Sequence, residues 1–191
     1  MPKTPAQFEK IRADRKSTIL NAALHVFAEE GYHSASISKV SKHAGVSKGL
    51  MYNYFESKEA LLHQLLHHIM HEEIKILEYL TVSDFTNESL IALIDRTFDL
   101  LAADSKHWKL YFRMSLQSDV LQIIMSDYAE VLGKFNTRFS NFFREKFGEN
   151  FHNEMQYFNT IFSGMKLSYV MQPETYPIES MKKKLVKQFI I

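Results

Sequence analysis

The sequence predicts an all-α protein, and three observations support this fold class. Apolar residues recur every three to four positions along most of the chain, which is the period of a helix that buries one side. Only 6 glycines and 4 prolines occur among the 191 residues, too few for the many turns of a β-sandwich or barrel. Hydrophobic residues make up 46% of the chain, enough for one domain or for a small module joined to a larger one.

The composition also excludes several kinds of site. The chain has no cysteine, which excludes disulfides, thiol catalysis and cysteine-based zinc sites. No apolar stretch reaches membrane-spanning length and the N-terminus lacks the apolar core of a signal peptide, so we expect a cytoplasmic protein without a membrane partner. Residues 1–60 hold nine Lys or Arg and six Asp or Glu, whereas the remainder is slightly acidic. This modest asymmetry favours nucleic-acid binding at the N-terminal end.

The first helix is predicted over residues 8–30, after a disordered start at residues 1–7. Its apolar positions follow helical spacing up to Gly31, which ends the helix. The early turns carry four basic residues: Lys10, Arg12, Arg15 and Lys16. These side chains are either an ordinary solvated face or an attraction for phosphates beside the recognition helix, and the pattern leaves both interpretations open.

The stretch over residues 36–61 predicts two short helices joined by a tight turn. Ser36 can cap the first helix and Ser47 the second, each accepting a hydrogen bond from a free backbone N–H. Gly45 ends the first helix because glycine adopts the left-handed conformation readily. The two short helices and the turn between them form a helix-turn-helix. In the second helix we expect Leu50 and Phe55 in the core.

The polar side of the second helix is expected to face outward, and it carries Lys48, Gly49, Tyr52, Asn53 and Tyr54. Such residues can approach a phosphate backbone and base edges, which an apolar surface could not do.

The whole segment closely resembles the DNA-binding domain of the TetR family of transcriptional regulators. The matching residues are Ala44-Gly45-Val46-Ser47, Gly49, Tyr52, Tyr54-Phe55, Lys58 and Leu61, and upstream Ile19, Ala22-Ala23, Phe27 and Gly31-Tyr32. They cover roughly the first third of the chain, and a match of this length is specific. Ser41 departs from the alanine that is usual there, but serine is small enough to fit.

The resemblance implies that a helix-turn-helix domain occupies residues 8–56, that residues 57–80 form a linking helix, and that residues 81–191 form a helical domain for effector binding and dimerisation. The predicted DNA-binding set is Ser36, Ser47, Lys48, Gly49, Tyr52, Asn53, Tyr54 and Lys58. Within it, Lys58 is expected to contact phosphates without selecting bases, and Gly49 to allow close backbone approach. In the family, the linking helix transmits ligand binding by a pendulum-like shift.

The remaining residues predict further helices over 87–103, 105–116, 119–147, 150–171 and 177–191. The helix over 150–171 is apolar on two sides, so both sides must be buried. Its second stripe consists of Tyr157, Ile161, Gly164 and Ser168. We expect this stripe to lie between subunits, since the resemblance implies a homodimer joined by the last two long helices of each subunit. A two-fold protein also suits a palindromic DNA site.

The resemblance places an effector pocket among the body helices. The candidate lining residues are Trp108, Phe112, Tyr128, Phe135 and Phe162. Apolar walls with few polar anchors suit a hydrophobic or aromatic effector.

Two other patterns have simpler explanations. Residues 45–49 match the G-x-S-x-G pattern of serine hydrolases, but that motif requires a preceding strand, and a turn glycine followed by a capping serine explains it. His63, His67 and His71 share a helix face at the spacing of metal ligands. Without further ligands we expect a solvated face and no metal site.

The sequence therefore predicts a homodimeric, ligand-responsive transcriptional regulator, a repressor that an unidentified small-molecule effector releases from double-stranded DNA. We expect no enzymatic activity and no cofactor. Two alternatives stay open: a helical protein–protein adaptor that keeps the fold without binding DNA, and an all-α enzyme with a DNA-binding head.

Overall fold

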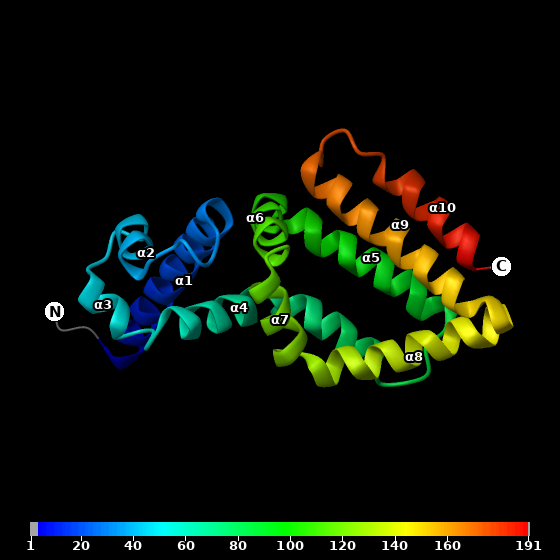
Figure 1. The fold of residues 1–191 in the computed structure, drawn as a ribbon, viewed down its shortest axis with the longest axis horizontal. Helices are drawn as coiled ribbons and strands as arrows, with labels where there is room; N and C mark the ends of the chain where they lie inside the picture. Colours follow the sequence, from blue (N-terminus) through cyan, green and yellow to red (C-terminus); the bar gives the residue numbers. More distant parts are fainter. Residues whose placement is uncertain (1–3, 191) are drawn as a thin grey trace. The chain divides into compact units, whose positions relative to one another are not determined.

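The computed structural model describes residues 4–190, and within this part the chain forms ten α-helices and one short 3-10 helix, with no strand, which confirms the all-α prediction (Figure 1). The helices are α1 (Pro5–Glu30), α2 (Ile37–His43), α3 (Lys48–Tyr52), α4 (Lys58–Leu80), α5 (Asn87–Ala103), α6 (Ser105–Ser115), α7 (Ser118–Asp127), α8 (Ala129–Phe147), the 3-10 turn η1 (Gly148–Asn150), α9 (Phe151–Met171) and α10 (Ile178–Phe189).

The chain divides into two compact units. The N-terminal unit holds the residues up to Met70 together with Leu110–Ile123, and the second unit holds His71–Lys109 and the residues from Ile124 onward. This division differs from the predicted boundary at residue 81, because α4 is shared between the units and the junction of α6 and α7 groups with the N-terminal helices.

The N-terminal unit is built on the second half of α1. Ile19, Ala23 and Phe27 are completely buried there, and so are Val40 of α2 and Met51 of α3. The start of α1 corrects one prediction, because residues 4–7 are ordered rather than disordered. The Thr4 hydroxyl accepts from the Gln7 N–H and the Gln7 side chain accepts from the Thr4 N–H, which forms a capping box. Residues 1–3 lie outside the described part.

The helix-turn-helix forms as its local signals predict. The Ser36 hydroxyl accepts from the Lys39 N–H at 3.2 Å, and the Ser47 hydroxyl accepts from the Leu50 N–H at 3.1 Å. Gly45 has φ +65°, the left-handed conformation expected between the helices. Of the two predicted core residues, Phe55 is buried as expected, whereas Leu50 is half-buried and its neighbour Met51 lies in the core instead. The helix is a single turn, too short for periodicity to fix which residue points inward.

The second unit has an aromatic core between α8, α9 and α10. The Phe158 ring centroid lies 5.5 Å from that of Phe139 and 5.2 Å from that of Phe189. The single helix predicted over 119–147 is instead two helices, α7 and α8, because Tyr128 leaves the helical conformation at φ −113° and ψ 18°. Since one non-helical residue barely disturbs the apolar period, the sequence pattern could not show this break.

The described helices include none that is long and apolar enough to cross a membrane.

Candidate nucleic-acid interface and effector cavity

The polar side of α3 is open to solvent. Lys48, Gly49 and Asn53 are exposed, and Tyr52 keeps 49% of its surface accessible. A Cβ added at Gly49 would meet nothing within 4 Å, so this part of the helix surface is unobstructed. An exposed helix surface with polar and cationic side chains can approach phosphates and base edges. Four of the predicted DNA-binding residues are thus accessible together on one short segment.

Two other members of the predicted set, Ser36 and Ser47, act through the backbone. Both hydroxyls accept the capping hydrogen bonds that begin α2 and α3. The two serines therefore fix where α2 and α3 begin. The other backbone N–H groups of each first turn remain free, and the N-terminus of a helix favours anions.

Tyr54 is half-buried and follows the end of α3. The guanidinium carbon of Arg12 lies 5.5 Å from the centroid of its ring, within the range of a cation–π contact. This contact joins the first half of α1 to the recognition segment, by which we mean α3 and the residues up to Tyr54. The sequence did not predict this pairing.

Lys58 corrects the sequence-based assignment. Its ammonium donates to the carbonyl oxygens of Tyr32, His33 and Ala35 at 2.9, 3.2 and 3.1 Å, and it lies 4.5 Å from the centre of the Tyr32 ring. An ammonium has three N–H donors, so all of them are used within the protein. Lys58 therefore holds the loop that leads into α2, and it has no donor left for a phosphate.

The same loop is held from a second direction by Gln117, at the junction of α6 and α7. Its side-chain amide donates to the Phe27 carbonyl at 3.1 Å and accepts from the Tyr32 N–H at 2.6 Å. Sequence reasoning missed Gln117 because it is 85 positions from Tyr32 and no local pattern marks it.

One ion pair and one histidine–carboxylate contact lie near Gln117. The Arg113 guanidinium is 2.5 Å from a Glu29 carboxylate oxygen, and the His33 imidazole contacts the Asp119 carboxylate. Burial raises the pKa of Tyr32 above its usual value of 10.0, and the negative charges of Glu59 and Asp119 act in the same direction. Tyr32 therefore remains neutral at physiological pH.

The second unit contains a cavity of about 230 Å³, partly open to solvent, between α4, α5, α8 and α9. Its walls are mostly apolar, with polar groups on α4, α5 and α9, as small-molecule sites commonly are. The lining residues are Glu73, Ile76, Leu77, Leu93, Thr97, Leu132, Phe135, Phe139, Phe158, Asn159, Phe162, Ser163 and Lys166.

Two of the five predicted effector residues, Phe135 and Phe162, line this cavity. Trp108 is instead buried, with its indole N–H donating to the Leu100 carbonyl at 3.1 Å. Tyr128 stands at the break between α7 and α8, and Phe112 belongs to the other compact unit. The polar members of the lining were missed, because polar residues at exposed helical positions resemble an ordinary solvated face.

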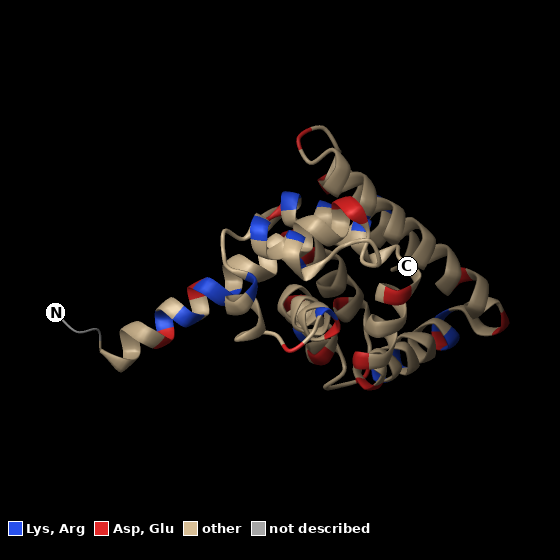
Figure 2. Ribbon diagram, turned by 60° about the vertical axis from the view of Figure 1, so that its left-hand side comes forward, with Lys and Arg blue, Asp and Glu red and all other residues tan. Residues whose placement is uncertain are grey.

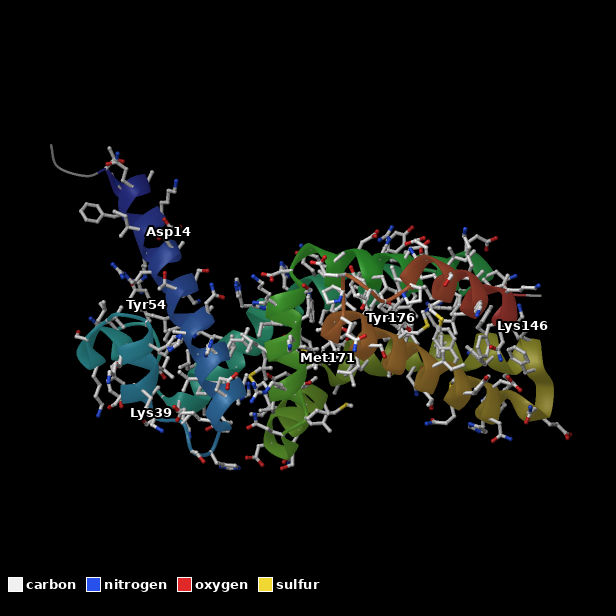
Figure 3. All side chains as sticks on the ribbon, turned by 90° about the horizontal axis from the view of Figure 1, so that it is seen from above. Asp14, Lys39, Tyr54, Lys146, Met171 and Tyr176 are labelled. Carbon is white, nitrogen blue, oxygen red and sulfur yellow. The ribbon has the colours of Figure 1, made fainter. Side chains whose placement is uncertain are left out.

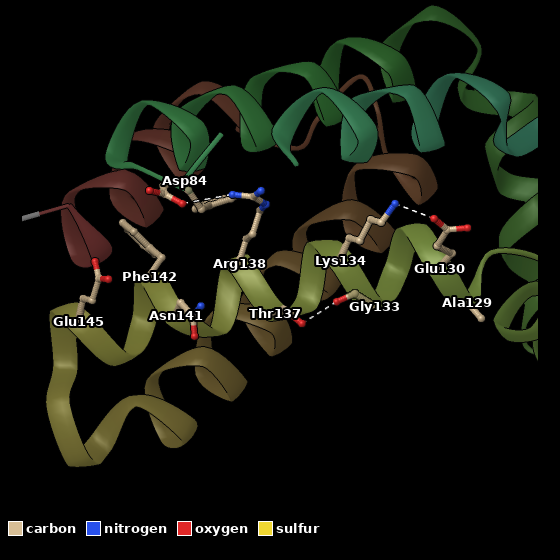
Figure 4. A pocket seen from close by; sticks show the side chains of 11 residues that line it. Asp84, Ala129, Glu130, Gly133, Lys134, Thr137, Arg138, Asn141, Phe142 and Glu145 are labelled. Atoms are coloured by element: carbon tan, nitrogen blue, oxygen red, sulfur yellow. Dashed lines mark hydrogen bonds and ion pairs between the residues drawn. The ribbon is translucent and has the colours of Figure 1, made fainter. Parts of the chain in front are cut away.

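A wider groove of about 670 Å³ runs along the outer side of α8 and the loop before α5 (Figure 4). It is lined by charges of both signs, including Glu130 and Lys134, which pair at 2.6 Å. Arg138 donates to the Ser83 carbonyl at 2.7 Å and to the Asp84 carboxylate at 3.2 Å. These charged groups already satisfy one another, so the smaller aromatic cavity is the better candidate for an apolar effector.

The predicted dimerisation stripe on α9 is accessible in the single chain. Gly164 and Ser168 are exposed, Ile161 is half-buried and Tyr157 is 48% exposed. Met171 continues the same apolar stripe and is 51% exposed. The neighbouring side of the helix, about 100° away, packs into the core through Phe158, Phe162 and Met165, among others.

Within residues 4–190, no group of three or more His, Cys, Asp or Glu side chains is arranged to hold a metal ion. His63 lies 4.0 Å from the Glu59 carboxylate on the same helix.

Comparisons with known proteins identify relatives of the helix-turn-helix region. Residues 19–65 match the family described as bacterial regulatory proteins, tetR family. The chain is 40% identical over 87 residues to the fatty acid metabolism regulator protein of Bacillus subtilis (strain 168), covering 45% of each. It is 32% identical over 102 residues to the HTH-type transcriptional activator FasR of Mycolicibacterium smegmatis, covering 53% of this chain and 47% of the relative. The chain thus spans about half the length of the curated relatives it matches.

Solved structures extend the likeness over most of the chain. The fatty acid degradation regulator FadR from Bacillus halodurans is 27% identical with a TM-score of 0.64, covering 91% of this chain and 96% of the other. FadR from Bacillus subtilis, solved in complex with stearoyl-CoA, is 26% identical with a TM-score of 0.66, covering 91% and 97%. The helix-turn-helix and these relatives agree: residues 19–65 form a DNA-binding domain of the TetR family, and the chain as a whole resembles the solved regulators of this fold.

Proposed function

We propose that the protein is a homodimeric, DNA-binding transcriptional repressor that leaves a palindromic operator when an effector places an apolar group in the cavity between α4, α5, α8 and α9. The observation that carries this proposal is the position of α4. Its first residue, Lys58, holds the loop before α2, and further along it contributes Glu73, Ile76 and Leu77 to the cavity. A ligand in the cavity therefore touches the same helix that supports the recognition segment.

The proposed dimer would suit the DNA-binding part of the proposal. The accessible stripe of Tyr157, Ile161, Gly164 and Ser168 offers small and apolar side chains on α9 for close helix packing. A two-fold dimer would place two copies of α3 in major grooves about one helical turn, or a multiple of it, apart. Each copy would present Lys48 and Tyr52 to the DNA.

For the effector, we propose an acyl thioester whose alkyl chain enters the cavity. The support is the stearoyl-CoA bound in the B. subtilis FadR structure, together with the aromatic walls of the cavity in this chain. Phe135, Phe139 and Phe162 would contact the alkyl chain, since burying each CH₂ is worth about 0.8 kcal/mol. Asn159 and Lys166, at the polar side, would face the thioester end.

Selection on random duplex DNA tests the DNA-binding proposal. We expect the full-length protein to enrich a palindrome with two equivalent half-sites. Enrichment of no sequence would refute it and favour a protein–protein adaptor. A reporter placed downstream of the enriched site then gives the sign of regulation, and we expect lower expression when the protein is present.

The effector proposal is tested by measuring release from that operator in the presence of stearoyl-CoA, stearate or CoA alone. We expect release by stearoyl-CoA and none by CoA. Ser163→Trp should block the response, because Ser163 is an exposed lining residue where a large side chain can enter the cavity without disturbing the core. Asn136→Trp is the matched control on exposed α8 surface outside the cavity lining. Equal responses of the two variants would contradict this site.

A further inference from the structure

The first half of α1 is an exposed helix that the proposed function has not used. Every residue from Thr4 to Lys16 is exposed, and burial begins only at Ile19. The stretch that matches the family model also begins at residue 19, so these turns lie outside it. The helix is nevertheless well formed, since Thr4 caps it and Pro5 occupies its first position.

The basic side chains of this segment are not neutralised within the described chain. Lys10, Arg12, Arg15 and Lys16 form no ion pair with a described acidic residue, and Figure 2 shows this run of Lys and Arg along the helix. Other cations of the same unit are already paired, as Arg113 is with Glu29 and Lys39 with Glu30. The α1 cations therefore remain available to an external anion.

The contact between Arg12 and Tyr54 fixes which side of α1 faces the recognition segment. A helix turns by about 100° per residue, so Arg15 and Lys16 lie within about 60° of the direction of Arg12. Lys10 lies on the opposite side, and so does Asp14, which Figure 3 labels on this half of α1. We call Arg12, Arg15 and Lys16 the α1 basic face.

One carboxylate borders this face. Glu9 lies about 60° from Arg12, on the same side as Lys16 and one turn nearer the N-terminus. The α1 basic face therefore carries three cations and is bordered by one anion, whereas the opposite side carries one cation, Lys10, and one anion, Asp14. The excess of positive charge is concentrated on the side that contacts Tyr54.

We propose that the α1 basic face binds the phosphate backbone of the DNA that flanks each half-site. This inference rests on the proposed DNA-binding function and extends it beyond the recognition segment. The helix rises about 1.5 Å per residue, so the four steps from Arg12 to Lys16 span about 6 Å, the length of about two base pairs. Arginine suits this contact because its planar guanidinium pairs with two phosphate oxygens at once. Phosphate contacts carry no sequence information, so flanks of any sequence should serve.

The test compares two duplexes that carry the selected palindrome, one ending at its outer base pairs and one extended by arbitrary sequence on both sides. We expect the full-length protein to bind the extended duplex about tenfold more tightly, and the double variant Arg15→Gln/Lys16→Gln to lose this gain. Four phosphate contacts per dimer are then lost, so the slope of log K against log salt on the extended duplex should fall by about 3.6. On the short duplex the variant should bind like the wild type.

The matched control is Lys10→Gln, which removes one cation from the opposite side of the same helix. We expect it to retain the preference for the extended duplex, whereas Glu9→Gln should increase that preference. Equal losses on both duplexes, or the same loss from Lys10→Gln, would overturn the proposal, because either result would mean a non-local effect of charge. If the wild type selects a palindrome but shows no length preference, the flank contact fails while the proposed function stands. If it selects no DNA, the proposed function itself fails.

Discussion

Replacing Lys58 with methionine is expected to destabilise the N-terminal unit while leaving the salt dependence of DNA binding unchanged. Methionine retains a long apolar side chain but has no N–H donors. The variant therefore loses the hydrogen bonds from the ammonium to the carbonyl oxygens of Tyr32, His33 and Ala35. These carbonyls lie in the loop that leads directly into α2, so the effect should centre on the helix-turn-helix.

The magnitude follows from the burial of these three bonds. Those to Tyr32 and Ala35 are part-buried, so each carbonyl left without a partner costs about 1–2 kcal/mol, whereas the carbonyl of His33 is in an exposed position and can bind water. Loss of the contact with the Tyr32 ring adds about 0.5–1 kcal/mol. The free energy of unfolding should therefore fall by about 3 kcal/mol, which lowers Tm by about 6–12 °C in a chain of this size.

Thermal unfolding measures the stability, and DNA binding at several salt concentrations measures the phosphate contacts. Lys48→Met is the matched control, because Lys48 is exposed on α3. We expect the control to keep its Tm and to lose about 0.9 of salt slope per subunit. If Lys58→Met behaved like this control, with an unchanged Tm and a smaller salt slope, Lys58 would be a phosphate contact after all and our reasoning would be refuted.

Three further changes have expected outcomes. Gln117→Ala leaves the Tyr32 N–H without its acceptor and should cost about 1–2 kcal/mol; hydrogen exchange at that amide should accelerate, and unchanged protection would count against the contact. Ile161→Glu places a charge in the proposed dimer stripe, so sedimentation should show a monomer with much weaker operator binding, and a persistent dimer would exclude this interface. Because burial raises the pKa of Tyr32, the folded state holds a proton that the unfolded state loses above pH 10.0, and stability falls as pH rises through that range. Tyr32→Phe should reduce this alkaline loss in urea unfolding at about pH 10.5 relative to about pH 8, and an equal loss in both proteins would contradict it.

The helix-turn-helix could be predicted because its signals are local. Ser36 and Ser47 cap helices through bonds to residues only three positions away, and Gly45 relieves a backbone strain at its own position. The helix predicted over 87–103 from its apolar period matches α5, which begins at Asn87. Free-energy terms of this kind depend on neighbours along the chain, so the sequence displays them directly.

Only the tertiary structure decided the roles of Lys58 and Gln117, the polar lining of the cavity and the break at Tyr128. Lys58 reaches carbonyls more than twenty positions away, and Gln117 reaches Tyr32 across 85 positions. A lysine at a helix start looks the same in sequence whether it faces a phosphate or a loop carbonyl. Which partner it meets depends on where folding brings distant backbone groups, because a hydrogen bond acts over about 3 Å in space whatever the separation along the chain.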